Sequence, residues 1–121
     1  IFRKNPNLII LSAKFKLKKS DPKKIKEYLE YRKEHQPLNF PSAGSVFKNP
    51  PGFLAGILIE KCGLKGKRMG HAEISKKHAN FIVNLGGAKA KDVKKLINLA
   101  KKSVKKKFDI VLQEEIQHLG F

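Results

Sequence analysis

The loop 37–49 places three reactive groups close together: the hydroxyl of Ser45, the ammonium of Lys48 and the carboxamide of Asn49. Gly44 frees the backbone just before the serine, and prolines on both flanks restrict the chain there. The side chains of this loop can therefore be held in fixed positions, as a reactive site requires. An ordinary polar loop is the alternative interpretation.

Ser45 is a candidate proton donor rather than a hydrolytic nucleophile. A nucleophilic serine needs a histidine base and an orienting acid, and the sequence offers no recognisable arrangement of them. A proton-donating serine needs a very basic acceptor, such as a carbanion, and a cation that tolerates the transient alkoxide. Lys48 could be that cation. The four histidines are irregularly spaced, which does not favour a metal site.

The elements around this loop follow from hydrophobic periodicity. Residues 8–17 begin as an apolar run and then alternate, which predicts a strand. Asp21 and Pro22 are typical of a helix start, and the apolar spacing predicts a helix to about Lys33. Residues 54–62 predict a short buried helix, and the glycine-rich stretch 63–70 predicts no regular structure.

The second half of the chain predicts a strand at 81–83 and a long amphipathic helix from Asp92 to about Lys107. The inner stripe of that helix comprises Val93, Leu96, Ile97, Ala100 and Val104. A terminal strand is expected from residue 110 onward, carrying the acidic pair Glu114 and Glu115. The resulting fold class is α+β, with a small sheet packed against helices.

Composition limits the function classes. A chain of 121 residues with 40% hydrophobic content is about one domain long. The formal net charge of +17 attracts anions, so a non-enzymatic basic domain that binds nucleic acid or another polyanion is an alternative function. Of the 27 basic residues 24 are lysines, and arginines interleaved with aromatics are lacking, which makes nucleic acid an unlikely partner.

The sequence contains neither a membrane-spanning stretch nor a signal peptide that we can recognise, and this predicts its localisation. No apolar run approaches the roughly 18 residues that a membrane span needs, and the first residues do not resemble a secretory signal. We therefore expect a cytoplasmic protein with no membrane partner.

Cys62 is the one cysteine, and its apolar neighbours predict a buried small hydrophobe without catalytic chemistry.

Four stretches carry a resemblance to a known family. They are Gln-Pro-Leu-Asn-Phe-Pro-Ser-Ala-Gly-Ser-Val-Phe-Lys-Asn-Pro at 36–50, the helix residues 55–60, the glycine-rich 63–72, and Lys-His-Ala-Asn-Phe-Ile-Val-Asn at 77–84. Together they resemble the UDP-N-acetylenolpyruvoylglucosamine reductases, the MurB-type bacterial flavoenzymes of peptidoglycan precursor synthesis, in their shorter subtype. The resemblance implies that 36–121 is the C-terminal substrate-binding domain and that 1–35 is the end of the FAD-binding domain.

The resemblance also implies a reaction. Hydride passes from NADPH to FAD and then to the vinyl carbon of UDP-N-acetylglucosamine enolpyruvate, which leaves a carbanion beside the carboxylate. In the family the second serine of the motif, here Ser45, supplies the proton that completes UDP-N-acetylmuramate. A C-terminal glutamate assists, and the Leu-x-x-Glu-Ile ending assigns that role to Glu115, with Glu114 as the alternative.

Further residues follow by motif position. Asn49 and Lys48 should contact the substrate, and His78 lies where the family places a polar side chain toward the sugar nucleotide. Arg32 or Lys33 is a candidate partner of the diphosphate, although solvation on a helix surface explains these two equally well.

The sequence also departs from the family pattern. The glycine-rich flavin-binding region and the Tyr-Arg-x-Ser signature are missing from these 121 residues, so no residues here are assigned to cofactor binding. The chain looks like a C-terminal fragment, one product of a split gene, or an inactive remnant. We expect that the chain alone neither holds FAD firmly nor turns over, and that its partner is the missing N-terminal FAD-binding region.

Overall fold

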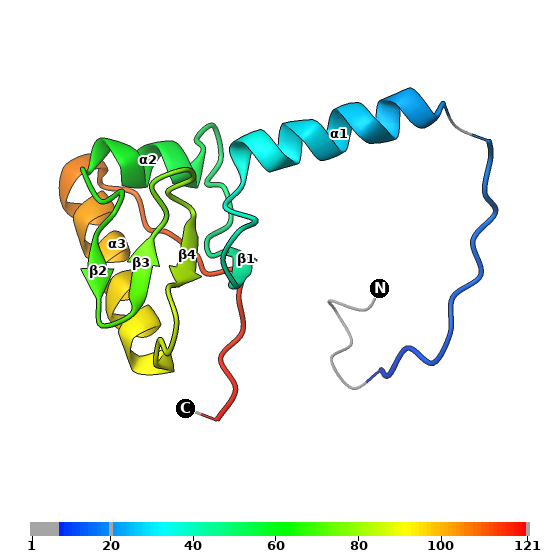
Figure 1. Ribbon diagram of the computed structural model, residues 1–121. Helices are drawn as coiled ribbons and strands as arrows, with labels where there is room; N and C mark the ends of the chain where they lie inside the picture. Colours follow the sequence, from blue (N-terminus) through cyan, green and yellow to red (C-terminus); the bar gives the residue numbers. More distant parts are fainter. Residues whose placement is uncertain (1–7, 20, 121) are drawn as a thin grey trace.

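The computed structural model describes residues 8–19 and 21–120 and has an α+β fold (Figure 1). The described elements, in chain order, are α1 (Pro22–His35), β1 (Ser42–Ser45), α2 (Ala55–Lys61), β2 (Arg68–Met69), β3 (Ala72–Ile74), β4 (Phe81–Asn84) and α3 (Ala90–Phe108). The four strands form one antiparallel sheet in the order β1-β4-β3-β2. The fold class predicted from the sequence is therefore confirmed.

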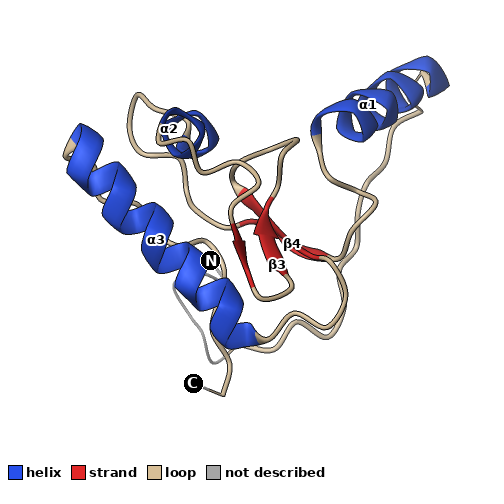
Figure 2. Cartoon of the chain, turned by 60° about the vertical axis from the view of Figure 1, so that its left-hand side comes forward, coloured by secondary structure: helices blue, strands red, loops and turns tan. Residues whose placement is uncertain are grey.

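The core lies between the sheet and the two helices α2 and α3. Figure 2 shows α3 running along one side of the sheet, with α2 beside its end. Four of the five predicted stripe residues of α3 are buried, and Val93 is half-buried at the start of the stripe. Helix α2 contributes Ala55, Leu58 and Ile59 to the same core. The sheet and both helices therefore form a stable base for the loops between them.

Helix α1 was predicted correctly, and it projects away from the rest of the chain (Figure 1). The carboxylate of Asp21 accepts a hydrogen bond from the backbone N–H of Lys23 at 2.9 Å, and Pro22 occupies the first helical position. The helix ends at His35, because Gln36 precedes a proline and is extended. No described residue of α1 is buried.

The strand predicted at 8–17 is wrong: the described residues 8–19 have no regular secondary structure. The sheet is built entirely from residues 42–84, and no described strand lies beside this segment. A strand without a neighbour cannot satisfy its backbone hydrogen bonds in pairs, so alternation alone does not form one. Its apolar side chains are exposed, including Ile9 at 85% and Leu11 at 93%.

Two further predictions need correction. The stretch 63–70 contains strand β2, which pairs with the unpredicted β3 through a tight connection at Gly70, whose φ is +54°. The terminal strand predicted after residue 110 is wrong, because only an isolated bridge between Phe47 and Glu114 forms there. Strand β2 was not predicted because its surroundings are rich in glycine. The expected terminal strand is instead an extended segment with one bridge.

Cys62 is half-buried and packs against the core, close to the predicted role of a small hydrophobe. Desolvation by burial raises the pKa of its thiol, and this disfavours the reactive thiolate. Among the described helices, none has the length and apolar character that crossing a membrane requires.

Candidate functional site

A cleft of about 470 Å³ brings together residues from five parts of the chain. Its walls are the segment 45–49, the start of α2, the turn 77–80, the last residue of α1 and the C-terminal segment. The lining includes Ser45, Lys48, Asn49, His78 and Glu115. The expected convergence of Ser45 and Glu115 on one cleft is therefore confirmed as geometry.

The segment that carries Ser45 is held by backbone hydrogen bonds on both edges. On one edge the N–H of Val46 donates to the carbonyl of Asn80 at 2.8 Å. On the other edge, Glu115 N–H donates to the Val46 carbonyl at 2.8 Å, and Lys48 N–H donates to the Gln113 carbonyl at 2.9 Å. Ser45 is also the last residue of strand β1, where the sequence predicted a loop. The serine therefore stands at the end of a strand, beside the C-terminal segment.

Asn80 lines this cleft, and no role was predicted for it from the sequence. Its buried side-chain amide pairs with both backbone groups of Phe47: Phe47 N–H donates to Oδ1 at 3.0 Å, and Nδ2 donates to the Phe47 carbonyl at 2.8 Å. In the sequence Asn80 was one residue of the stretch 77–84 that carries the family resemblance, and a polar residue directly before the strand Phe81–Asn84. That signal does not reveal a partner 33 positions away.

Asn49 anchors the segment at its other end. Its Oδ1 accepts a hydrogen bond from the backbone N–H of Ala55 at 3.0 Å, the first residue of α2. The N-cap residue Leu54 makes no side-chain hydrogen bond of its own, so Asn49 caps this helix from a distance. The oxygen of Asn49 holds the helix start in this way, and the amide nitrogen is the group that can donate to a ligand.

His78 is placed in the cleft by contacts on three sides. Its Nδ1 accepts a hydrogen bond from the backbone N–H of Asn80 at 3.2 Å, so the neutral ring carries its proton on Nε2. The ring packs edge-on against Phe81, with centroids 4.9 Å apart. Desolvation by burial lowers the pKa of His78, which favours that neutral form. Gly56 lies so close that an added Cβ would be 3.1 Å from His78 Cε1.

Arg32 and Lys33 do not line this cleft, although His35 on the same helix does. Arg32 Nε donates to Gln36 Oε1 at 3.4 Å, and the Lys33 carbonyl accepts from the ammonium of Lys77 at 2.8 Å. Lys77 lines the cleft and thereby joins it to the C-terminal end of α1. The sequence did not single out His35 or Lys77.

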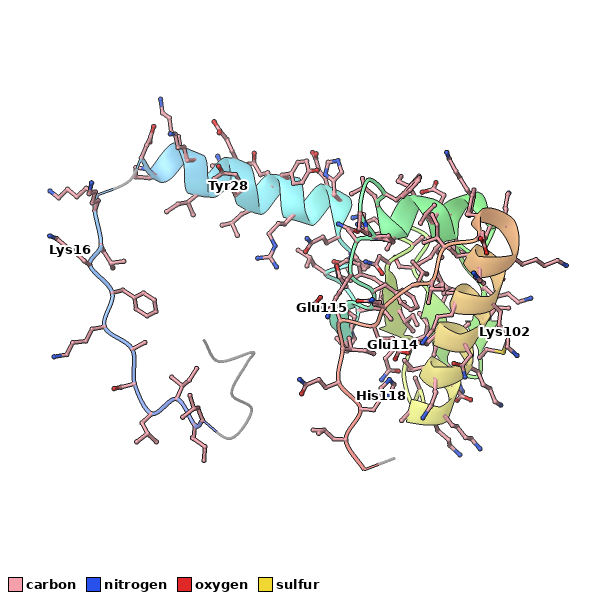
Figure 3. All side chains as sticks on the ribbon, turned by 180° about the vertical axis from the view of Figure 1, so that it is seen from behind. Lys16, Tyr28, Lys102, Glu114, Glu115 and His118 are labelled. Carbon is pink, nitrogen blue, oxygen red and sulfur yellow. The ribbon has the colours of Figure 1, made fainter. Side chains whose placement is uncertain are left out.

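The acidic pair at the C-terminal end is divided between two environments. Figure 3 labels both glutamates with His118 on the C-terminal segment. Glu114 lies 2.8 Å from Lys101 Nζ and 2.6 Å from His118 Nε2, and the hydrogen bond from Lys101 lowers its pKa most. Glu115 is the member of the pair that lines the cleft. Adjacent side chains of an extended segment point to opposite sides, which separates Glu114 from Glu115.

Comparisons with known proteins agree with the resemblance seen in the sequence. A family model described as UDP-N-acetylenolpyruvoylglucosamine reductase, C-terminal domain, matches residues 36–119. The chain is 54% identical to the UDP-N-acetylenolpyruvoylglucosamine reductase of Caldicellulosiruptor bescii over 97% of this chain and 39% of that relative. It is 53% identical to the reductase of the same name from Fervidobacterium nodosum, over 97% of this chain and 40% of that relative.

The fold is similar to a solved structure of the same name. The crystal structure of UDP-N-acetylenolpyruvylglucosamine reductase (MurB) from Thermus caldophilus matches with a TM-score of 0.62 and 44% identity. The match covers 78% of this chain and 33% of that chain. The chain thus spans about two-fifths of the length of the curated relatives cited above.

Proposed function

Because the chain belongs to the family of UDP-N-acetylenolpyruvoylglucosamine reductase C-terminal domains, we propose that it forms the substrate side of such a reductase. The reaction would convert UDP-N-acetylglucosamine enolpyruvate to UDP-N-acetylmuramate for peptidoglycan synthesis. One observation carries this proposal: Ser45 and Glu115, 70 positions apart in the sequence, line the same cleft.

Ser45 is assigned the proton transfer. Hydride addition to the vinyl carbon leaves an electron pair on the carbon beside the substrate carboxylate, and that carbon takes the proton from Ser45 Oγ. The serine is left as an alkoxide, which the ammonium of Lys48 on the same segment would stabilise. The hydroxyl is then restored by a proton from solvent. Glu115 would polarise the substrate carboxylate or share the transferred proton.

The remaining cleft residues would hold the sugar nucleotide. Asn49 offers its amide nitrogen, and the neutral ring of His78 offers its Nε2 proton to acceptors on the substrate. The substrate carries a diphosphate, which suits the cationic side chains at this cleft and on the end of α1. We assign the diphosphate to Arg32 or Lys33, near the C-terminal end of α1 and outside the residues that line the cleft.

The flavin is not assigned to residues of this chain. Segment 8–19 and helix α1, which we propose to be the end of the flavin domain, are exposed throughout and by themselves do not fit FAD. When bound by the remaining part of the reductase, FAD reduced by NADPH would supply the hydride. The exposed apolar residues of α1, among them Ile25, Tyr28 and Leu29, are proposed to pack against that part.

The test joins this chain to the N-terminal part of the Caldicellulosiruptor bescii reductase and compares Ser45→Ala with Ser42→Ala. Ser42 is the matched control, because it lies on the same strand and lines a different groove. Ser45→Ala should lower substrate reduction about 10²- to 10⁴-fold, the usual contribution of general acid catalysis. Flavin reduction by NADPH should stay within about twofold in both variants, since it precedes the proton transfer.

Two results would contradict the proposal. Equal loss in both half-reactions for Ser45→Ala would indicate a folding defect instead of a lost proton donor. Full substrate reduction by Ser45→Ala would remove this serine from the mechanism. The 121-residue chain without the added N-terminal part is expected to show no NADPH oxidation.

A further inference from the structure

On the edge that faces β4, no strand residue pairs with the N–H and carbonyl of Phe47, because the chain forms the turn 77–80 there. The bridge to Glu114 lies on the opposite edge. The side chain of Asn80 pairs with these two groups instead. Strand β4 begins only at Phe81, and its pairing with β1 ends at Ser45. The Phe81 N–H donates to the carbonyl of His78 at 3.0 Å, so the chain before β4 turns away from Phe47. A buried N–H and carbonyl without partners would destabilise the fold.

The Asn80 amide takes the place of that missing strand residue. An amide side chain carries one donor and one acceptor, as a peptide group does, and Asn80 gives both to Phe47. The opposite edge of the same segment is paired with Gln113 and Glu115. The segment 46–48 is therefore fixed from both edges, and Asn80 supplies one of them.

This arrangement links the cleft residues to one another through Asn80. Ser45 directly precedes the fixed segment 46–48 and Lys48 is its last residue, while Glu115 is joined to the segment by its own N–H. The backbone N–H of Asn80 also fixes the ring of His78 through Nδ1. Although Asn80 is counted among the cleft-lining residues, its amide donor and acceptor are both engaged by Phe47.

We propose that Asn80 is a positioning residue, which sets the spacing of Ser45, Lys48 and Glu115 by clamping Phe47 in an extended pairing. The inference rests on the proposed function for the roles of those three residues. The clamp itself is a property of the chain. It predicts that Asn80 affects the rate of proton transfer more than substrate affinity, since misplacement of about 1 Å can lower a rate about 10²-fold.

The test compares Asn80→Ala with Asn84→Ala in the 121-residue chain and in the chimeric reductase defined above. Asn84 is the matched control, because its side chain also makes two backbone hydrogen bonds, both accepted by Oδ1 from Gly86 and Ala88, and it lies at the other end of β4. In the chain, Asn80→Ala should speed hydrogen exchange at the Phe47 amide about tenfold, and the control should not. In the chimera, Asn80→Ala should lower kcat about 10²-fold while KM stays within about threefold.

A second variant, Asn80→Asp, distinguishes positioning from loss of stability and serves if Asn80→Ala does not fold. A carboxylate accepts from the Phe47 N–H but repels the Phe47 carbonyl, whereas a protonated carboxyl donates and accepts as the amide does. Burial raises the pKa of such a carboxyl. The kcat of Asn80→Asp, relative to the unsubstituted chimera, should therefore recover as pH falls.

The two proposals fail in different ways. Unchanged Phe47 exchange in Asn80→Ala, unchanged kcat in that variant, or equal loss of kcat in Asn84→Ala would each overturn the positioning role. An inactive unsubstituted chimera would count against the proposed function instead. In that case the exchange measurement on the chain still decides whether Asn80 clamps Phe47.

Discussion

Gly56 makes room for the imidazole of His78, and replacing it with alanine tests how firmly that ring is held. The residue is the second of helix α2 and has ordinary helical geometry, so alanine at this position should itself stabilise the helix by at most about 1 kcal/mol. The new Cβ would lie 3.1 Å from His78 Cε1 and 3.6 Å from Asn80 Cβ. Carbon atoms prefer a separation of about 3.5–4.0 Å, so the ring would have to move by several tenths of an ångström.

The surroundings of His78 resist that movement. The ring packs edge-on against Phe81 and accepts the Asn80 N–H, so a shift loses one of these contacts. Overpacking of this kind costs about 1–3 kcal/mol, which outweighs or cancels the helical gain. We expect Gly56→Ala to lower the free energy of unfolding by about 0–2 kcal/mol.

The assay is urea denaturation of four proteins: the unsubstituted chain, Gly56→Ala, His78→Ala and the double variant. Without the imidazole the clash disappears, so Gly56→Ala should become stabilising by up to about 1 kcal/mol in the His78→Ala background. The coupling energy of the cycle should therefore be about 1–3 kcal/mol. A stabilising effect of the same size in both backgrounds would refute the reasoning and show that His78 is free to move.

Two more predictions concern Asn49, which lines the cleft, and Glu114, which pairs with Lys101. Asn49→Ala should lower the free energy of unfolding by about 1 kcal/mol, because Ala55 N–H loses its cap. The control is Asn98→Ala on the exposed face of α3, which should not lower it and should stabilise by up to about 0.7 kcal/mol through helix propensity in the same urea series. Glu114 has a lowered pKa, so its stabilising contribution should be present above pH 4.5 and disappear as pH falls through its folded-state value. The difference in unfolding free energy between the unsubstituted chain and Glu114→Gln should shrink accordingly, and a difference independent of pH would contradict the hydrogen bond from Lys101.

Much of the fold could be predicted from local patterns in the sequence. Helix α1 follows from its capping residue and apolar spacing, and α3 follows from apolar spacing alone; both form close to their expected bounds. Strand β4 follows from a run of buried apolar residues before two glycines. The two helices depend on neighbours in sequence, so local reasoning was sufficient for them, and the apolar run of β4 was recognisable without knowledge of its partners β1 and β3.

The errors share one physical cause, which is pairing with distant residues. Residues 8–17 have the alternation of a strand but lie beside no other described strand. The two-residue strand β2 exists because β3 is available to pair with it, in spite of its glycine-rich surroundings. A strand is a property of two segments, and a single pattern cannot supply the second one.

The chemistry that this chain can offer could be predicted from its residue types and short motifs. Its motif placed Ser45, Lys48 and Asn49 within five residues, and its resemblance to a reductase family assigned a proton donor and a C-terminal glutamate. Those conclusions depend on residue types and short spacings, which are fixed before folding. The Leu-x-x-Glu-Ile ending assigned the assisting role to Glu115, and Glu114 remained the alternative as the neighbouring carboxylate.

Which of these groups lie close together depends on how the chain packs. The extended C-terminal segment turns Glu115 toward the cleft and Glu114 toward Lys101, because adjacent side chains point to opposite sides. It also brought in Lys77 and His35, and it gave Asn80 a partner in Phe47. Such contacts join residues dozens of positions apart, and they exist only once the sheet and helices have packed.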